Sequence, residues 1–253
     1  MQNRQKTKHI NQIWNKLMKY KFNKAFTLAE VLITLGIIGV VAALTIPNLI
    51  NNYTHKRNIN AWKKAYATFT QVAKQISYDY DVDTFEDAIR LQEVDDNLTP
   101  SGNVVTQPVI NLLSRYFSNT NFTCNGNCNG RNGWNCDGIL VEKYVSGKTG
   151  YKYLNGVDAG YWVLGYHPTV CAQTPAFTFA LDTNTSSYGR ISVDVNGKKP
   201  PNTIGIDIFT LNMNNLNEVI PGGGKNYYSS NNFACDKNAT QGGPACSKKY
   251  LEQ

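Results

Sequence analysis

The sequence predicts an α+β fold in which a long N-terminal helix packs on an antiparallel sheet. Two patterns favour it. Apolar residues recur at helical spacing after residue 60, and they alternate with other residues in short segments after residue 160. The polar breaks between those segments are typical of hairpins, and a helix against such a sheet forms a two-layer domain. A chain of 253 residues is long enough for one such domain and an additional segment.

The N-terminal leader, residues 1–25, carries the whole excess of positive charge. It holds seven of the 25 Lys and Arg residues and no acidic residue, so the remaining 18 balance the 18 acidic residues. The net charge of +7 therefore does not indicate a nucleic-acid-binding surface on the rest of the chain, and no nucleic-acid partner is expected.

Residues 26–46 form an apolar run in which Glu30 is the only charged residue. At about 1.5 Å per residue, a helix of this length spans the hydrocarbon core of a bilayer. The basic leader predicts a single pass, with the N-terminus cytoplasmic and the rest of the chain outside. A secretory signal cleaved near Val41-Ala42-Ala43 and a plain signal anchor are two interpretations. A charged residue within such a run favours a functional role for that residue.

A third interpretation comes from the residues around Glu30. The stretch KAFTLAEVLITLGIIGVVAALTIP, residues 24–47, resembles the N-terminal cleavage and methylation motif of type IV prepilins and type II secretion pseudopilins. The resemblance implies that a prepilin peptidase cuts between Ala25 and Phe26 and that Phe26 is then N-methylated. Glu30 becomes the fifth residue of the mature chain, and Pro47 takes the place of a helix-kinking proline.

The leader differs from the usual family pattern in two ways. The family usually has Gly before the cut, whereas this chain has the small residue Ala25. The leader is also long from Met1, and a start at Met18 would give the short basic leader MKYKFNKA.

The resemblance gives Glu30 a physical role. Cutting before Phe26 creates an amino group that is charged near neutral pH, at the tip of an apolar helix. Such a cation needs a partner in an apolar setting, and Glu30 of a neighbouring subunit can supply it. Glu30 and Pro47 are therefore expected to serve assembly, and Pro47 is expected to kink or locally unwind the helix.

These features divide the chain into four parts. Residues 1–25 are the basic cytoplasmic leader, which is cleaved, and residues 26–47 are the transmembrane and filament-core helix. Residues 48–80 continue the helix in amphipathic form, and residues 81–253 form a globular head with disulfide-stapled loops. The apolar stripe of the amphipathic part comprises Trp62, Tyr66, Phe69, Val72 or Ala73, Ile76 and Tyr80. In the head we expect a short helix over 108–117 and strands over 161–166, 176–182, 190–195 and 204–211.

All the cysteines follow the apolar run, and they are Cys124, Cys128, Cys136, Cys171, Cys235 and Cys246. An even number beyond a membrane segment favours disulfides in an oxidising compartment. A zinc site and free thiols are the alternatives, and spacing does not choose among the 15 ways of pairing six cysteines. The resemblance implies that Cys235 and Cys246 close a C-terminal loop.

The stretch ISVDVNGKKPPNTIGIDIF, residues 191–209, resembles a segment found in pseudopilin-like heads. Asp194, Asn196 and Asp207 are candidate calcium ligands because some pseudopilins bind calcium in a loop of the head. The alternative is that Asp194 and Asn196 cap a turn by accepting backbone hydrogen bonds. No other cofactor is expected.

The sequence lacks the common catalytic motifs, so we do not expect an enzyme. The resemblance implies a structural subunit of a type II secretion pseudopilus or a type IV pilus-like filament. Its partners would be the prepilin peptidase, other pilin or pseudopilin subunits and an inner-membrane assembly platform. The chain would reside in the bacterial inner membrane and then in the filament. A single-pass envelope protein that is membrane-anchored, serves binding or adhesion and does not polymerise is the alternative.

Overall fold

The computed structural model describes residues 26–92, 106–123, 151–159, 168–182, 189–197, 199–225 and 227–253. The chain divides into two compact units, Met1–Asn52 and Tyr53–Gln253. The second unit is called the head below. The strand expected over residues 161–166 lies outside the described residues.

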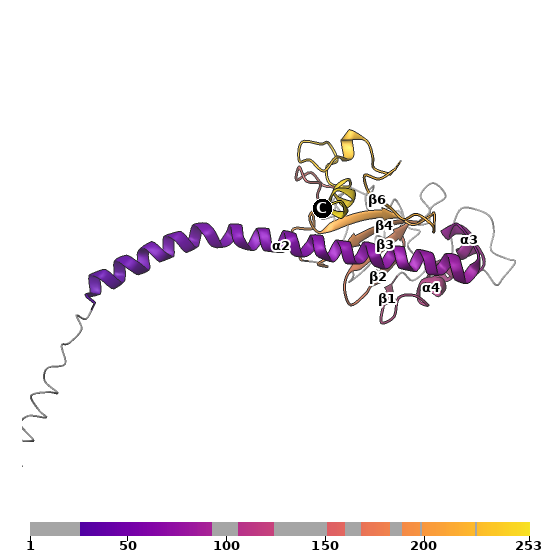
Figure 1. Cartoon of the computed structure of the whole chain (residues 1–253), viewed down its shortest axis with the longest axis horizontal. Coiled ribbons are helices and arrows are strands. Elements are labelled where there is room, and N and C mark those ends of the chain that lie inside the picture. Colours follow the sequence, from indigo (N-terminus) through magenta and orange to yellow (C-terminus); the bar gives the residue numbers. More distant parts are fainter. Residues whose placement is uncertain are drawn as a thin grey trace, which may run out of the picture. The chain divides into compact units, whose positions relative to one another are not determined.

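Helix α2 (Leu28–Tyr80) contributes to both units (Figure 1). Within the head it is amphipathic, and its buried residues are Asn58, Trp62, Ala65, Phe69, Val72, Ala73 and Ile76. The stripe predicted from the sequence is confirmed, and its members Tyr66 and Tyr80 pack against the core while partly exposed. The head's core therefore begins on this helix.

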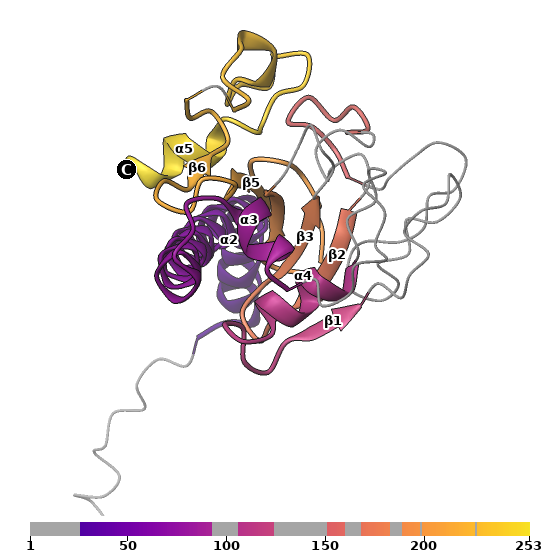
Figure 2. The ribbon, with the colours of Figure 1, turned by 90° about the vertical axis from the view of Figure 1, so that its right-hand side faces the viewer.

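The sheet is an antiparallel meander in which each strand pairs with the next one in the sequence. Its strands are β1 (Asn121–Thr123), β2 (Pro168–Gln173), β3 (Thr178–Asp182), β4 (Arg190–Asp194), β5 (Ile208–Asn212) and β6 (Ile220–Pro221). Figure 2 shows α2 along one face of this sheet, with α5 and β6 near one edge and α4 and β1 near the other. The α+β architecture predicted from the sequence is confirmed.

The strand register explains which face meets the helix. Phe179 of β3, Val193 of β4 and Phe209 of β5 lie side by side across three strands, and all belong to the core. The ring of Phe69 packs edge-on against Phe179, with 5.2 Å between ring centroids. The Trp62 ring stacks on Phe209 at 5.0 Å. Aromatic side chains thus fill the space between helix and sheet.

The opposite face of the sheet carries small side chains in the alternate row. Cys171, Ala180, Ser192 and Thr210 are cross-strand neighbours in that order, and all are buried. Burial therefore does not alternate as the residue types do, and β3 is buried along its whole length. A strand covered on both faces reads as a continuous run of small and apolar residues rather than as an alternating one.

The strand expected over 204–211 begins only at Ile208. The preceding residues form a turn in which the Asp207 carboxylate accepts a hydrogen bond from the Thr203 N–H and the Ile206 N–H donates to the Thr203 carbonyl. The local hydrogen bonds of Asp207 outweigh the strand propensity of the isoleucines.

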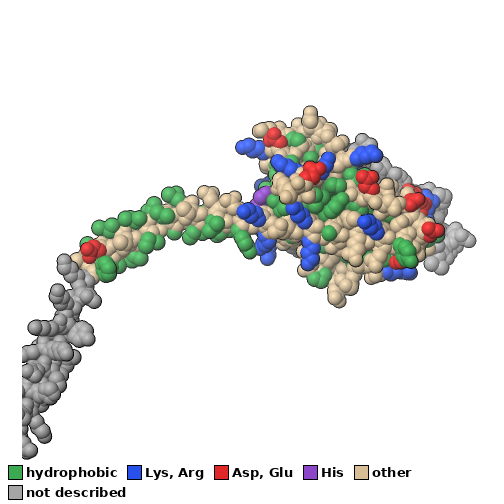
Figure 3. All heavy atoms as spheres, in the orientation of Figure 1, with side chains coloured by type: hydrophobic (Ala, Val, Ile, Leu, Met, Phe, Trp, Pro, Cys, Tyr) green, Lys and Arg blue, Asp and Glu red, His purple; other side chains and the backbone are tan. Residues whose placement is uncertain are grey.

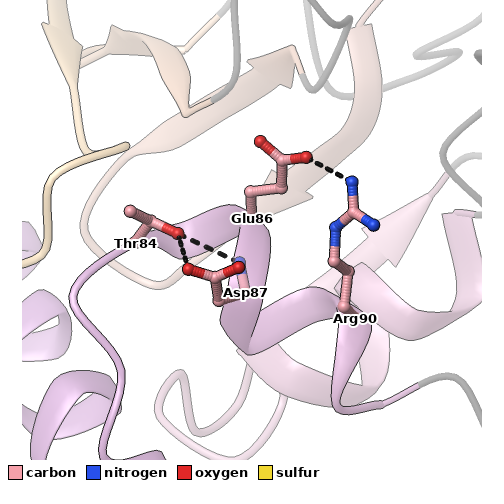
Figure 4. A network of polar contacts seen from close by, with 4 residues as sticks. All are labelled: Thr84, Glu86, Asp87 and Arg90. Atoms are coloured by element: carbon pink, nitrogen blue, oxygen red, sulfur yellow. Dashed lines mark hydrogen bonds and ion pairs between the residues drawn. The ribbon is translucent and has the colours of Figure 1, made fainter.

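The described part of the head also contains four short helices, namely α3 (Phe85–Arg90), α4 (Thr106–Leu113), the 3₁₀ helix η1 (Asn231–Phe233) and α5 (Cys246–Leu251). The helix predicted over 108–117 is α4, which ends at Leu113 and continues as turns through Phe117. Helix α3 begins where Thr84 accepts a hydrogen bond from the Asp87 N–H and donates to its carboxylate (Figure 4). Glu86 and Arg90 form an ion pair one turn apart on the same helix.

The C-terminus is fastened to the core through α5. The Trp62 indole Nε1–H donates to the Ser247 carbonyl at 2.9 Å, and the Ser247 hydroxyl accepts from the Thr210 N–H at 2.9 Å. A disulfide joins Cys246 to Cys235, with 4.6 Å between their Cα atoms. Ser247 thus links the last helix to both α2 and the sheet.

Trp62 is the residue through which helix, sheet and C-terminus meet, so its loss should destabilise the head. We expect Trp62→Ala to lower the free energy of unfolding by about 3–5 kcal/mol, because a large fully buried ring is removed. Trp62→Phe should cost less, since it keeps an aromatic ring and loses only part of the indole together with the bond to Ser247. Thermal unfolding of the detergent-solubilised full chain measures both. If both variants lowered the free energy of unfolding equally, packing of the Trp62 ring would not be its main contribution to stability.

Candidate functional site

The part of α2 in the first unit is an exposed apolar helix. By length and composition α2 could cross a membrane, and none of its most apolar window is buried. Its large exposed apolar residues up to Ile50 are Leu28, Val31, Leu32, Ile33, Leu35, Ile37, Ile38, Val40, Val41, Leu44, Ile46, Leu49 and Ile50. An apolar surface of this extent marks a membrane or protein contact.

Glu30 belongs to a capping box at the start of this helix. The Thr27 N–H and the Thr27 hydroxyl both donate to Oε2 of Glu30, at 2.8 and 2.9 Å. The Glu30 N–H donates back to the Thr27 hydroxyl at 3.2 Å. This reciprocal arrangement satisfies N–H groups that have no partner within the helix. The sequence analysis missed the role of Thr27, although the pattern Thr-x-x-Glu before an apolar run predicts it.

The capping box fixes where the helix begins. Because Thr27 is the cap, α2 starts at Leu28 and leaves Phe26 outside the helix. The Phe26 side chain is 83% exposed. Ala25 lies outside the described residues. The expected cleavage point therefore adjoins a residue that is neither helical nor buried.

The two hydroxyls further along the apolar segment are satisfied within the helix. Thr34 donates to the Val31 carbonyl at 3.0 Å, and Thr45 donates to the Val41 carbonyl at 2.9 Å. Such internal bonds suit a helix in an apolar medium, where no water is available. Within the described residues, the side-chain hydrogen bonds of Glu30 engage only Oε2. The Glu30 carboxylate thus keeps one oxygen for an outside partner.

Pro47 lies inside α2, and the helix continues through it without interruption. Of the kink or local unwinding expected at Pro47, the unwinding is therefore absent, and the kink stays a prediction. Proline has no N–H, so the Ala43 carbonyl lacks the helical hydrogen bond that it would otherwise accept from this position. The structure places Pro47 in the same apolar unit as Glu30, about 26 Å along the helix.

Three of the expected disulfide cysteines, Cys124, Cys128 and Cys136, lie outside the described residues. Cys171 is disulfide-bonded and buried in β2. Cys235 and Cys246 are joined to each other, which is the pairing that the resemblance implies. In the described part of the chain, no three His, Cys, Asp or Glu side chains cluster as metal ligands.

The structure brings Asp194, Asn196 and Asp207 together at the turn after β4. The Asn196 N–H donates to Oδ1 of Asp194 at 3.1 Å, and the Asn196 Nδ2 donates to Oδ2 of Asp207 at 3.0 Å. Asp207 also accepts from the N–H groups of Asn202 and Thr203, at 2.9 and 2.6 Å. The three side chains thereby tie the loop between β4 and β5 into one hydrogen-bonded unit.

These carboxyls are almost completely buried, with 2% of Asp194 and none of Asp207 exposed. Burial raises the pKa of Asp194 to about 7, although hydrogen bonds from the Asn196 and Gly197 N–H groups oppose the rise. Burial also raises the pKa of Asp207, against the hydrogen bonds from Thr203 and Asn202. Asp194 is therefore a group whose charge changes near neutral pH.

Calcium takes six to eight oxygen ligands. Among these side chains, only Oδ2 of Asp194 and Oδ1 of Asn196 are buried without a hydrogen-bond partner. As they lie, the residues fit a hydrogen-bonded turn rather than a calcium sphere. Calcium binding by Asp194, Asn196 and Asp207 stays a prediction.

The raised pKa of Asp194 predicts how the stability of the head depends on pH. Between pH 3.8 and about 7, the folded chain holds a proton on Asp194 that the unfolded chain releases, so stability falls as pH rises through this window. Asp194→Asn keeps an oxygen for the Asn196 N–H and removes the titration. From pH 5 to pH 8, the free energy of unfolding of the natural chain should fall by about 2 kcal/mol more than that of Asp194→Asn.

Thermal unfolding of the full chain at both pH values measures this difference. Asp236→Asn, in the C-terminal loop, is the matched control because Asp236 is exposed and its Oδ1 likewise accepts a local N–H. Parallel pH profiles for Asp194→Asn and the natural chain would show that the Asp194 carboxyl is not buried as described.

Comparison with known families identifies one matching segment. Residues 20–46 match the family model described as the prokaryotic N-terminal methylation motif. The match covers the apolar start of α2 together with Thr27 and Glu30. No curated protein and no solved structure matches the chain.

Proposed function

We propose that this chain, which carries the prepilin-type cleavage and methylation signal of type IV pilins and pseudopilins, is a filament subunit of a type II secretion pseudopilus or a type IV pilus-like fibre. The observation that carries the proposal is the match at residues 20–46, centred on a charged residue in an exposed apolar helix. The fold supports it, because a long apolar helix followed by an antiparallel sheet is consistent with the pilin fold.

Processing begins at the cytoplasmic end of α2. The motif implies a prepilin peptidase, which hydrolyses the peptide bond between Ala25 and Phe26. Hydrolysis leaves an amino group on Phe26, and that group takes up a proton near neutral pH. Methylation keeps the amine basic, so the mature chain begins with a cation beside an apolar helix.

Assembly then pairs opposite charges between subunits. When apolar helices pack together, the Phe26 cation of one subunit needs an anion away from water. The free oxygen of Glu30 on a neighbouring subunit supplies it, while Oε2 remains bonded to Thr27. This pair sets the axial position of one subunit against the next, because elsewhere each buried charge would remain unpaired.

The location follows from the same features. The motif and the apolar helix are consistent with a pilin anchored in the inner membrane. We propose that the leader faces the cytoplasm, that the head lies outside, and that subunits leave the membrane for the filament through an assembly platform. The motif's family is structural, so the work proposed for this chain is mechanical rather than catalytic.

The variant Glu30→Gln tests assembly without disturbing the start of the helix. Glutamine at this position of a capping box still accepts from Thr27, so only the charge is lost. We expect normal head folding and at least a tenfold drop in filament recovered by shearing cells, because the neighbouring cation loses its partner.

Glu218→Gln, an exposed residue of the head, serves as the control and should leave the filament yield unchanged. If Glu30→Gln yields as much filament as the natural chain, the proposed pair between Phe26 and Glu30 is wrong. Absence of filaments from the natural chain, with the leader intact, would favour a membrane-anchored protein that does not polymerise.

A further inference from the structure

The exposed face of α2 in the head carries charge of one sign. From Tyr53 to Tyr78 the helix contains no acidic residue, and its basic residues are Lys56, Arg57, Lys63, Lys64 and Lys74. Figure 3 shows blue side chains along this stretch of the head. These five residues are called the basic stripe.

The basic stripe has no acidic partner within the described residues. The ion pairs found there are Arg90 with Glu86 and Lys248 with Glu252. Helix α5 adds positive charge beside the stripe, since the Tyr250 ring packs edge-on against His55 and α5 also carries Lys249. This side of the head is therefore a cationic surface whose charges form no ion pair with the described part of the subunit.

Acidic residues gather where α2 ends. They are Asp79, Asp81, Asp83, Glu86 and Asp87. Nearby, Arg90 pairs with Glu86, and Arg115 donates to the Tyr80 hydroxyl at 2.7 Å. Two basic residues against five acidic ones leave this part of the head negative. Figure 3 shows red side chains at the end of the head that carries α3.

The middle of the basic stripe, Lys63 and Lys64, is too far from the acidic residues to meet them within one subunit. Lys64 and Asp81 are 17 residues apart, which corresponds to about 26 Å along the helix. Lysine and aspartate side chains do not bridge such a gap. The charges do meet between two copies displaced along the helix axis by about 26 Å, which brings Lys64 of one copy level with Asp81 of the other.

We propose that the basic stripe is an interface between copies of this chain, and that it receives the acidic segment Asp79–Asp87, which runs from the last turn of α2 into α3, from a copy displaced along the filament axis. The inference rests on the proposed filament and adds a contact between heads to the contact between apolar helices. Repeated along a filament, individually weak surface pairs set subunit orientation and make assembly sensitive to salt.

The length of the stripe distinguishes this partner from a membrane surface. Lys56 and Arg57 follow the apolar segment closely and could reach lipid headgroups. The whole stripe, however, extends about 27 Å from Lys56 to Lys74. The headgroup layer on one side of a bilayer is only about 5–8 Å thick. A second copy of the chain can place its acidic residues against Lys63, Lys64 and Lys74, the part of the stripe that lies beyond such a layer.

Zero-length crosslinking of carboxylates to amines tests the contact directly. Sheared filaments of the natural chain are treated with a carbodiimide, digested and analysed by mass spectrometry. We expect amide links between Lys63 or Lys64 and Asp81 or Asp83, which must join two subunits because of the separation within one chain. Filaments that lack these links would overturn the interface and leave the proposed function standing. Failure to form any filament would overturn both.

A charge exchange provides the second test. The variant Lys63→Glu/Lys64→Glu should lower filament yield at least fivefold, and Asp81→Lys/Asp83→Lys should do the same. Combining all four substitutions should restore most of the yield. The control Lys225→Glu/Lys237→Glu reverses two exposed lysines outside the stripe and should have no effect.

Two outcomes of the charge exchange would overturn the proposal. Natural yields for both double variants would show that the surfaces do not meet. If the four-fold variant stays defective while Lys63→Glu/Lys64→Glu also loses binding to vesicles containing phosphatidylglycerol, the stripe contacts the membrane instead.

Discussion

The carboxylate of Glu30 at the start of an exposed apolar helix is the constraint from which the rest of this molecule can be understood. A charge in that setting is unfavourable unless a cation meets it, and within the described residues Glu30 receives only the hydrogen bonds of Thr27 on its side chain. Those bonds hold the carboxylate at the helix tip and leave one oxygen for a partner. In the function that we propose, the partner is the amino group of Phe26, which removal of the leader creates, and this would link processing to assembly chemically.

The same helix serves a second purpose in the head. Beyond Asn52, the exposed apolar surface gives way to a buried stripe that packs on the sheet through Trp62 and Phe69. Trp62 also holds the C-terminal helix through Ser247, which lies 185 residues away in the sequence. Helix α2 is thus apolar in the first unit and amphipathic in the head. The basic stripe on its exposed face in the head is the surface that we propose for contacts between heads.

Much of this could be predicted from the sequence where the pattern is local. The spacing of Trp62, Phe69 and Ile76 predicted the buried helix face, and the alternation around Phe179 and Val193 predicted β3 and β4. The prediction failed where long-range packing decides. β2 was missed because its buried residues, such as Cys171 and Ala172, are small and do not alternate. The start of β5 was misplaced because Asp207 holds the preceding residues in a turn.

At the candidate site, the apolar run and Glu30 were evident from the sequence, whereas the role of Thr27 required the hydrogen bonds. The most direct test of the central claim is mass spectrometry of the N-terminal peptide from the native membrane and sheared-surface fractions. A peptide that begins with N-methylated Phe26 is the result predicted by cleavage after Ala25. A peptide that still contains Lys24-Ala25-Phe26 would mean an uncleaved anchor. A start at Leu44 would mean a secreted domain, and either result would contradict the filament account.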